Sequence, residues 1–241
     1  MLNTTPLVTL LASRAHDSFF NASGELLREQ EGGPALYIER VFRAEHLLYV
    51  LHTPPSVQVS LTVQDNEEIG TVERASSPLV LSYESFQTPF LFISTILDDF
   101  NLSGIESYRG SIFLDIQGYV RDPANPFRKR LWDNFSTIAP AFFCIKGTAE
   151  EMATLPHKAV ADMQQRGIVL VTRGKEGCEV FAHGIHQKLA PPRVIKTTTT
   201  VGAGDTFFAH FFVRFSATHN VMESAQFALL YTSHFLAEIK I

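Results

Sequence analysis

Short apolar segments alternate with amphipathic ones along the chain, and this alternation limits the fold more than any other feature of the sequence. Apolar runs of strand length recur, with helical patterns between them. This alternation predicts a mostly parallel sheet covered on both faces by helices, an α/β fold. The expected strands are residues 7–12, 90–93, 111–115, 142–145 and 168–172, and the expected helices include 125–139, 155–166 and 220–238.

Polar residues follow several of these strands. Asp17, Asp115, Lys146 and Thr172 each stand at or near the end of an apolar run. In open parallel sheets, ligands bind at the carboxyl ends of the strands. We therefore expect these four residues beside a ligand site.

Residues 199–208, Thr-Thr-Val-Gly-Ala-Gly-Asp-Thr-Phe-Phe, place two glycines and a carboxylate where a loop becomes a helix. A helix start has free N–H groups and the positive end of the peptide dipole, so Gly202, Ala203 and Gly204 can hold a developing negative charge. Asp205 can take a proton from a hydroxyl that attacks a phosphoryl group bound there. The same residues also fit an ordinary turn, in which Asp caps the helix and Gly bends the chain.

Three further segments lie upstream of this motif. Residues 168–181 predict a strand, a glycine-punctuated turn and a second strand. Residues 142–151 predict a strand that ends in a polar loop and an acidic helix start. Residues 8–17 predict a strand that ends in an Asp, and the Gly-Gly-Pro of residues 32–34 then opens a helix.

In this order the segments resemble the ribokinase-like (PfkB-type) carbohydrate kinases, in which Thr-x-Gly-x-x-Gly precedes Gly-Ala-Gly-Asp and an Asp followed by Gly-Gly lies far upstream. The resemblance covers nearly the whole chain. It implies one domain over residues 1–241, a three-layer sandwich with a mostly parallel central sheet flanked by helices and a β lid. It also makes Asp205 the base that deprotonates a sugar hydroxyl, and Gly202, Ala203 and Gly204 the anion hole.

The resemblance assigns binding residues as well. Asp17 corresponds to the carboxylate that binds sugar hydroxyls, and Gly32 and Gly33 correspond to the glycines that let a substrate approach the backbone. The residues that match the turn along the nucleotide are Thr172, Gly174 and Gly177.

Several positions depart from the family pattern. Thr199 stands where relatives usually have an Asp that helps to bind a monovalent cation, which puts activation by potassium in doubt. Thr148 replaces the Asn of the Asn-x-x-Glu segment that organises magnesium through water, whereas Glu151 retains the Glu and is assigned to the outer shell of Mg²⁺. Tyr37 replaces the Asn that usually follows the Gly-Gly pair, and either narrows the substrate pocket or places a ring against the substrate.

The β lid that relatives insert at two places is short in this chain. Residues 18–31 and 56–73 match the insertions, and the second contains one good strand, residues 57–63. The sequence therefore predicts a reduced, rudimentary lid. The sugar site is then either open or closed by a second subunit, and the second arrangement is a homodimer.

Composition argues against several other classes of protein. A net charge of −5 disfavours a nucleic-acid surface, and no apolar run approaches the 18 residues of a membrane-spanning helix. Cys144 and Cys178 lie in apolar, strand-like stretches, which predicts reduced buried thiols. The apolar start lacks the basic region of a signal peptide and fits a first core strand better, so we expect a cytoplasmic location.

Other polar segments have plainer interpretations. Residues 115–121 can offer Gln117 or Arg121 to a substrate, but we interpret them as a plain loop. The basic run in residues 127–132 is interpreted as a solvated face at a helix start. The phenylalanine-rich helix after Asp205 is expected to be buried on most of its circumference.

The sequence thus predicts a small kinase that transfers the γ-phosphoryl group of ATP, with Mg²⁺, to a hydroxyl group of a sugar, nucleoside or related polyol. Two alternatives stay open. One is a kinase for a heterocyclic vitamin-precursor alcohol, although relatives of that kind commonly have Cys in place of Asp205. The other is a catalytically silent nucleotide- or sugar-binding regulator, which Thr148, Thr199 and the short lid favour.

Overall fold

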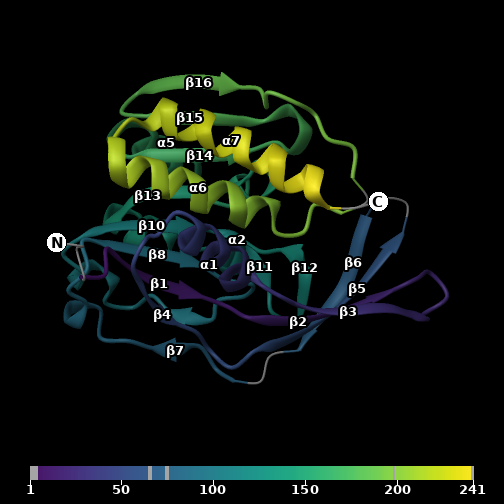
Figure 1. The fold of residues 1–241 in the computed structure, drawn as a ribbon. Helices are drawn as coiled ribbons and strands as arrows, with labels where there is room; N and C mark the ends of the chain where they lie inside the picture. The colour runs from purple at the N-terminus through teal and green to yellow at the C-terminus, as the bar shows by residue number, and fades with distance from the viewer. Residues whose placement is uncertain (1–4, 65–66, 74–75, 198, 240–241) are drawn as a thin grey trace.

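A central sheet organises the computed structural model, which describes residues 5–64, 67–73, 76–197 and 199–239 (Figure 1). The sheet has eight strands, in the order β16 (Ile185–Leu189), β15 (Cys178–Ala182), β14 (Ile168–Thr172), β13 (Phe142–Thr148), β10 (Ser111–Asp115), β8 (Phe90–Ser94), β1 (Val8–Ala12) and β4 (Tyr49–His52). Strands β14 to β4 are parallel, and β15 and β16 add an antiparallel hairpin at one edge. The predicted mostly parallel sheet is confirmed.

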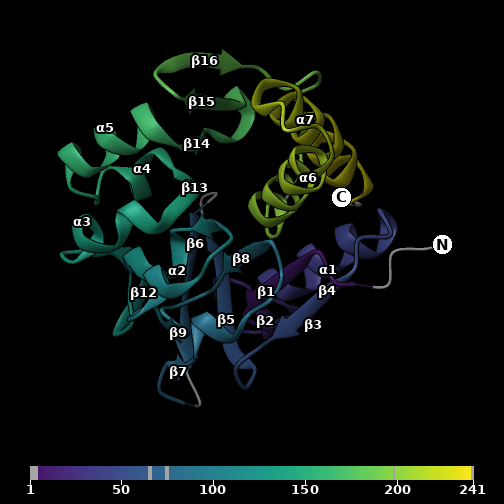
Figure 2. The same ribbon diagram turned by 90° about the vertical axis from the view of Figure 1, so that its left-hand side faces the viewer.

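Helices cover both faces of this sheet (Figure 2). One face carries α1 (Pro34–Ala44), α6 (Ala203–Thr218) and α7 (Val221–Glu238), and the other carries α2 (Gln117–Val120), α3 (Phe135–Ile138), α4 (Ala149–Met152) and α5 (His157–Arg166). Successive side chains of a strand point to opposite faces, so Leu10 belongs to the core beneath α6 and Leu11 to the core on the α5 side. No described helix is long and apolar enough to cross a membrane.

Helix α6 is fixed by phenylalanine packing. Its side chains interleave with rings from the central sheet: the centroid of Phe208 lies 4.5 Å from that of Phe92, and Phe212 lies 5.0 Å from Phe113. The phenylalanines of α6 that are buried are Phe207, Phe208, Phe211, Phe212 and Phe215. The expected burial of this helix is confirmed, and this packing holds the start of α6 in place.

A second sheet projects from the end of the central one (Figure 1). It contains β3 (Leu26–Gly32), β2 (Ala15–Phe20), β5 (Val57–Gln64) and β6 (Glu67–Glu73) in that order. The sequence predicted one strand in residues 56–73, and the structure has two. Strand β6, Glu-Glu-Ile-Gly-Thr-Val-Glu, has little apolar alternation and is held by antiparallel pairing with β5. The lid is thus a four-stranded sheet whose apolar face packs on Ile96 and Leu97.

Two further expectations are corrected. The prediction of a helix over residues 125–139 is wrong. Strand β12 (Asn125–Lys129) pairs with β11 (Arg121–Asp122), and within that range only Phe135–Ile138 is α-helical. Pro126 lacks the N–H that a helix interior needs. Asp17 lies within lid strand β2, because β1 already ends at Ala12.

The remaining elements are short, and both thiols are free. Strands β7 (Leu79–Val80) and β9 (Phe100–Asn101) pair with each other, and the 3₁₀ turns are Tyr83–Ser85, Ile105–Ser107, Ala139–Ala141 and Gly174–Glu176. Cys144 and Cys178 are unpaired and buried, as the sequence predicted.

Phe208→Ala tests the packing of α6. Phe208 is fully buried, so truncation should lower the free energy of unfolding by about 3–5 kcal/mol, measured by urea denaturation. Leu27→Ala is the control, because Leu27 is 63% exposed and its truncation should change stability little. A loss below about 1 kcal/mol for Phe208→Ala would contradict tight packing of α6 on the sheet.

Candidate active site

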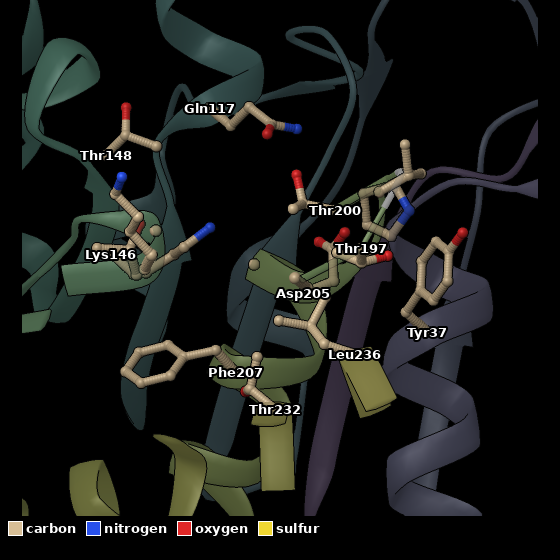
Figure 3. Close-up of a pocket in the computed structure, with 18 of the residues that line it drawn as sticks. Tyr37, Gln117, Lys146, Thr148, Thr197, Thr200, Asp205, Phe207, Thr232 and Leu236 are labelled. Atoms are coloured by element: carbon tan, nitrogen blue, oxygen red, sulfur yellow. The ribbon is translucent and has the colours of Figure 1, made fainter. Parts of the chain in front are cut away.

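One cavity of about 520 Å³ lies where the central sheet, the lid and the start of α6 meet. Ten of the predicted site residues line it: Asp17, Gly33, Glu151, Thr172, Gly174, Gly177, Gly202, Ala203, Gly204 and Asp205. Figure 3 shows Asp205 at the start of a helix, with Lys146 on one side and Tyr37 on the other. The cavity thus joins segments from both ends of the chain.

The start of α6 depends on a close contact at Gly202. This residue is the N-cap and has a φ of 79°, a conformation that favours glycine. A Cβ atom at Gly202 would lie 2.4 Å from the ring of Tyr37. The N–H of Ala203 donates to the carbonyl of Thr200 at 3.0 Å, whereas the N–H groups of Gly204 and Asp205 have no acceptor within a helix. These two are therefore the donors best placed for an anion.

Asp205 has the environment of a general base. Its Oδ1 accepts a hydrogen bond from Ser94 Oγ at 2.9 Å, at the end of β8. Burial raises the pKa of Asp205 to about 6, while the charge of Lys146 opposes the rise and that of Asp115 adds to it. A carboxylate with this pKa is ionised at neutral pH and is more basic than an exposed aspartate.

Asp115 and Lys146 form a buried ion pair beside Asp205. Asp115 ends β10 and pairs with Lys146 on the neighbouring strand β13. Lys146 Nζ lies 2.7 Å from Asp115 Oδ2. Burial alone would lower the pKa of Lys146, but the carboxylates of Asp115, Glu151 and Asp205 together raise it above its ordinary value. The ammonium group is therefore charged at neutral pH. The sequence placed both residues at strand ends without giving either a role.

The lid end of the cavity contains Asp17 and Tyr37. Burial raises the pKa of Asp17 to about 6 and that of Tyr37 to about 12, so the phenol stays neutral and can donate a hydrogen bond. A Cβ atom at Gly32 would lie 1.9 Å from Asp17 Oδ2, so Gly32 makes room for this carboxylate. Gly33, with a φ of 83°, begins α1 and lines the cavity. The role of either glycine toward a substrate stays a prediction.

A turn and several apolar side chains also line the cavity. The turn between β14 and β15 carries Thr172, Gly174 and Gly177. Gly177 has a φ of 95°, and a Cβ atom there would lie 2.0 Å from the carbonyl oxygen of Leu189. The apolar side chains are Val194 and Ile195, which precede α6, and Leu229 and Leu236 from α7.

Glu151 is buried and held in place. Glu151 Oε2 accepts the N–H of Thr148 at 2.8 Å, Thr148 Oγ1 accepts the N–H of Glu151 at 3.2 Å, and Lys129 Nζ lies 3.8 Å from Glu151 Oε1. Within the described residues, no group of three or more His, Cys, Asp or Glu side chains forms a metal site. Glu151 nevertheless lines the cavity, which fits a magnesium ion held mainly by the phosphates of a donor, with this carboxylate in its outer shell.

Residues 115–121 are not a plain loop. Gln117 begins helix α2, its N–H donates to Asp115 Oδ1 at 3.1 Å, and both Gln117 and Arg121 line the cavity. The sequence analysis offered both residues as substrate contacts but preferred a plain loop. The position of their segment directly after a predicted strand was the signal that could have favoured the contact. Ser94 gave no such signal, because its contact with Asp205 joins positions 111 residues apart.

Comparison with known proteins assigns the family. Residues 114–234, half of the chain, match the pfkB family carbohydrate kinase model. The chain belongs to this family. The predicted ribokinase-like fold and the assignment to carbohydrate kinases are therefore confirmed.

Two solved structures share the fold. A pyrophosphate-dependent kinase in the ribokinase family, complexed with a pyrophosphate analog and myo-inositol, is 17% identical with a TM-score of 0.75, covering 97% of this chain and 96% of that one. A nucleoside kinase from Methanocaldococcus jannaschii is 13% identical with a TM-score of 0.69, covering 95% of this chain and 91% of that one.

A curated relative is similar over a shorter stretch. Inositol 3-kinase from Oryza sativa subsp. japonica is 31% identical over 77 residues, which are 32% of this chain and 18% of that protein. The chain thus aligns with less than a fifth of the length of that relative.

The pKa of Asp205 is open to direct measurement. Carbon-13 NMR of the aspartate carboxyl groups, with Asp205→Asn to assign the signal, should show a midpoint near pH 6. In Ser94→Ala the midpoint should move to higher pH, because the lost hydrogen bond favours the ionised form. A wild-type midpoint near 4 would contradict the desolvated setting of this carboxylate.

Proposed function

We propose that the protein transfers the γ-phosphoryl group of ATP, with magnesium, to a hydroxyl group of a sugar, nucleoside or related polyol. The observation that carries the proposal is the position of Asp205, a half-buried carboxylate with a pKa of about 6 at the start of α6. Asp17 lines the same cavity, so an acceptor bound there has a hydroxyl-binding carboxylate at one end and a base at the other.

In the proposed reaction, Asp205 takes the proton of the acceptor hydroxyl as its oxygen forms a bond to the γ-phosphorus. The bond from that phosphorus to the bridging oxygen breaks, and ADP leaves with the electron pair. The N–H groups of Gly204 and Asp205, at the positive end of the α6 dipole, stabilise the charge on the transferring group. Magnesium, when bound, neutralises phosphate charge, and Glu151 holds its water shell.

A cyclic polyol is the first acceptor to test. Asp17, Gln117, Arg121 and the phenol of Tyr37 all line the cavity, and together they offer hydrogen-bond donors and acceptors suited to several hydroxyl groups. The name of the rice relative and the myo-inositol in a solved neighbour support the same choice.

ATP is proposed as the donor because the cavity has apolar side chains in its wall, those of Val194, Ile195, Leu229 and Leu236. A purine ring requires such apolar surface, whereas pyrophosphate does not. Several structural neighbours are pyrophosphate-dependent, so pyrophosphate is the donor to compare.

The test is a matrix of donors and acceptors with magnesium. ATP and pyrophosphate are each combined with sugars, nucleosides, inositols and vitamin alcohols, and phosphorylated products are detected by ³¹P NMR. The proposal expects a phosphomonoester from ATP and at least one polyol. Tight binding of ATP without transfer to any acceptor would instead support the silent regulator.

Replacing the base should abolish most of the activity. Asp205→Asn keeps the size of the side chain but removes its proton affinity, so kcat should fall by about 10²–10⁴ while the thermal unfolding temperature changes little. Asp162→Asn on the exposed side of α5 is the matched control and should retain normal kcat. Near-normal turnover by folded Asp205→Asn would remove Asp205 from the mechanism.

Potassium should matter little. Thr199 has no charge, and its hydroxyl oxygen already accepts the N–H of Val201 at 3.2 Å. Replacing sodium by potassium at constant ionic strength should therefore change the rate less than about threefold, while chelation of magnesium should abolish it. A larger potassium effect would reveal a cation site that Thr199 does not prevent.

A further inference from the structure

Lys146 reaches the start of α6 from the central sheet. It lies in β13, only 3% of its surface is exposed, and it lines the cavity. A Cβ atom at Gly204 would lie 2.9 Å from Lys146 Nζ. The missing side chain at Gly204 therefore admits the ammonium group to the first turn of α6, where the family motif places the transferring phosphoryl group.

The charges around Lys146 suit a site where a bound phosphate needs a fixed cation. Two buried carboxylates, Asp115 and Glu151, and the half-buried carboxylate of Asp205 act electrostatically on its ammonium group and keep it charged. Lys129 Nζ lies 3.8 Å from Glu151 and makes a second positive group at the edge of this cluster. A phosphoryl group bound at Gly204 and Asp205 would lie beside the Asp205 carboxylate, and Lys146 supplies a cation next to Gly204.

Stability alone does not explain a lysine here. A buried ion pair contributes little net stability compared with apolar residues of the same volume, because desolvation offsets the attraction. An ammonium group carries three N–H donors, and Asp115 accepts one of them at 2.7 Å. The group is thus held in a fixed orientation and still has donors for a ligand in the cavity.

We propose, on the basis of the function proposed above, that Lys146 is a catalytic residue whose Nζ binds a non-bridging oxygen of the transferring phosphoryl group, together with the N–H of Gly204. Lys146 keeps its protons throughout. It stabilises the negative charge that spreads over the phosphoryl oxygens while the hydroxyl proton passes to Asp205. Asp115 positions the ammonium group and takes no part in proton transfer.

If Lys146 binds the terminal phosphate, its replacement should weaken the binding of ligands that have this phosphate more than the binding of ligands that lack it. Binding of magnesium–ATP and magnesium–ADP is measured by calorimetry for wild type, Lys146→Met and the control Lys158→Met, which lies on the exposed side of α5. Lys146→Met should weaken ATP binding at least tenfold more than ADP binding and lower kcat roughly a hundredfold to a thousandfold. Pyrophosphate and phosphate serve as the second pair of probes, so a pyrophosphate donor is tested as well.

The double variant Asp115→Asn/Lys146→Met covers a failure of Lys146→Met to fold, since it removes both charges of the buried ion pair. It should recover the thermal stability of wild type but keep the low kcat and the weakened terminal-phosphate binding. Equal losses for both members of each ligand pair, or recovery of kcat by the double variant, would make Lys146 structural and overturn the proposal. An inactive wild type that still shows the tenfold difference would refute the proposed function and leave the binding role of Lys146 intact.

Discussion

The buried pair of Asp115 and Lys146 is the contact on which the rest of the site depends. It joins neighbouring parallel strands β10 and β13, and Ser94 links the next strand, β8, to Asp205 on α6. Neither charge could remain buried without the other, because an unpaired buried ion is costly. The pKa of Asp205 therefore depends on groups at the ends of three neighbouring strands: Asp115 on β10, Lys146 on β13 and Ser94 on β8.

Apolar packing and missing side chains complete this arrangement. The phenylalanines of α6 anchor the helix on the sheet, so its first turn faces the strand ends at a fixed distance. Glycines then allow three close approaches: Gly202 to the ring of Tyr37, Gly204 to the ammonium group of Lys146, and Gly32 to the carboxylate of Asp17. A methyl group at any of these positions would displace a polar or aromatic group that lines the cavity.

Local signals in the sequence were enough to predict five of the six parallel strands, all but β4, and the helix that begins at the Gly-Ala-Gly-Asp segment. Strands 111–115 and 168–172 have the predicted bounds, because buried parallel strands are continuous apolar runs. The missed features depend on tertiary pairing. Strand β6 has a polar sequence and needs β5 beside it, and β12 replaces a predicted helix because it pairs with β11.

The candidate site was predictable to a similar degree. The glycines and Asp205 belong to short motifs in the sequence. Lys146 was expected beside a ligand site without a role, and Gln117 and Arg121 were offered only as alternatives, because the folded sheet is what brings these two segments to one cavity. The role of Gly32 shows the limit most clearly. Its motif suggested room for a substrate, but the space beside it is occupied by the carboxylate of Asp17.

A crystal structure with magnesium, a non-hydrolysable ATP analogue and a phosphorylatable polyol would test the central claim most directly. The account predicts a polyol hydroxyl within about 2.6–3.2 Å of the Asp205 carboxylate and the terminal phosphate on the N–H of Gly204 and on Lys146 Nζ. A terminal phosphate bound away from the start of α6, or a polyol whose hydroxyl groups all lie beyond reach of Asp205, would contradict it.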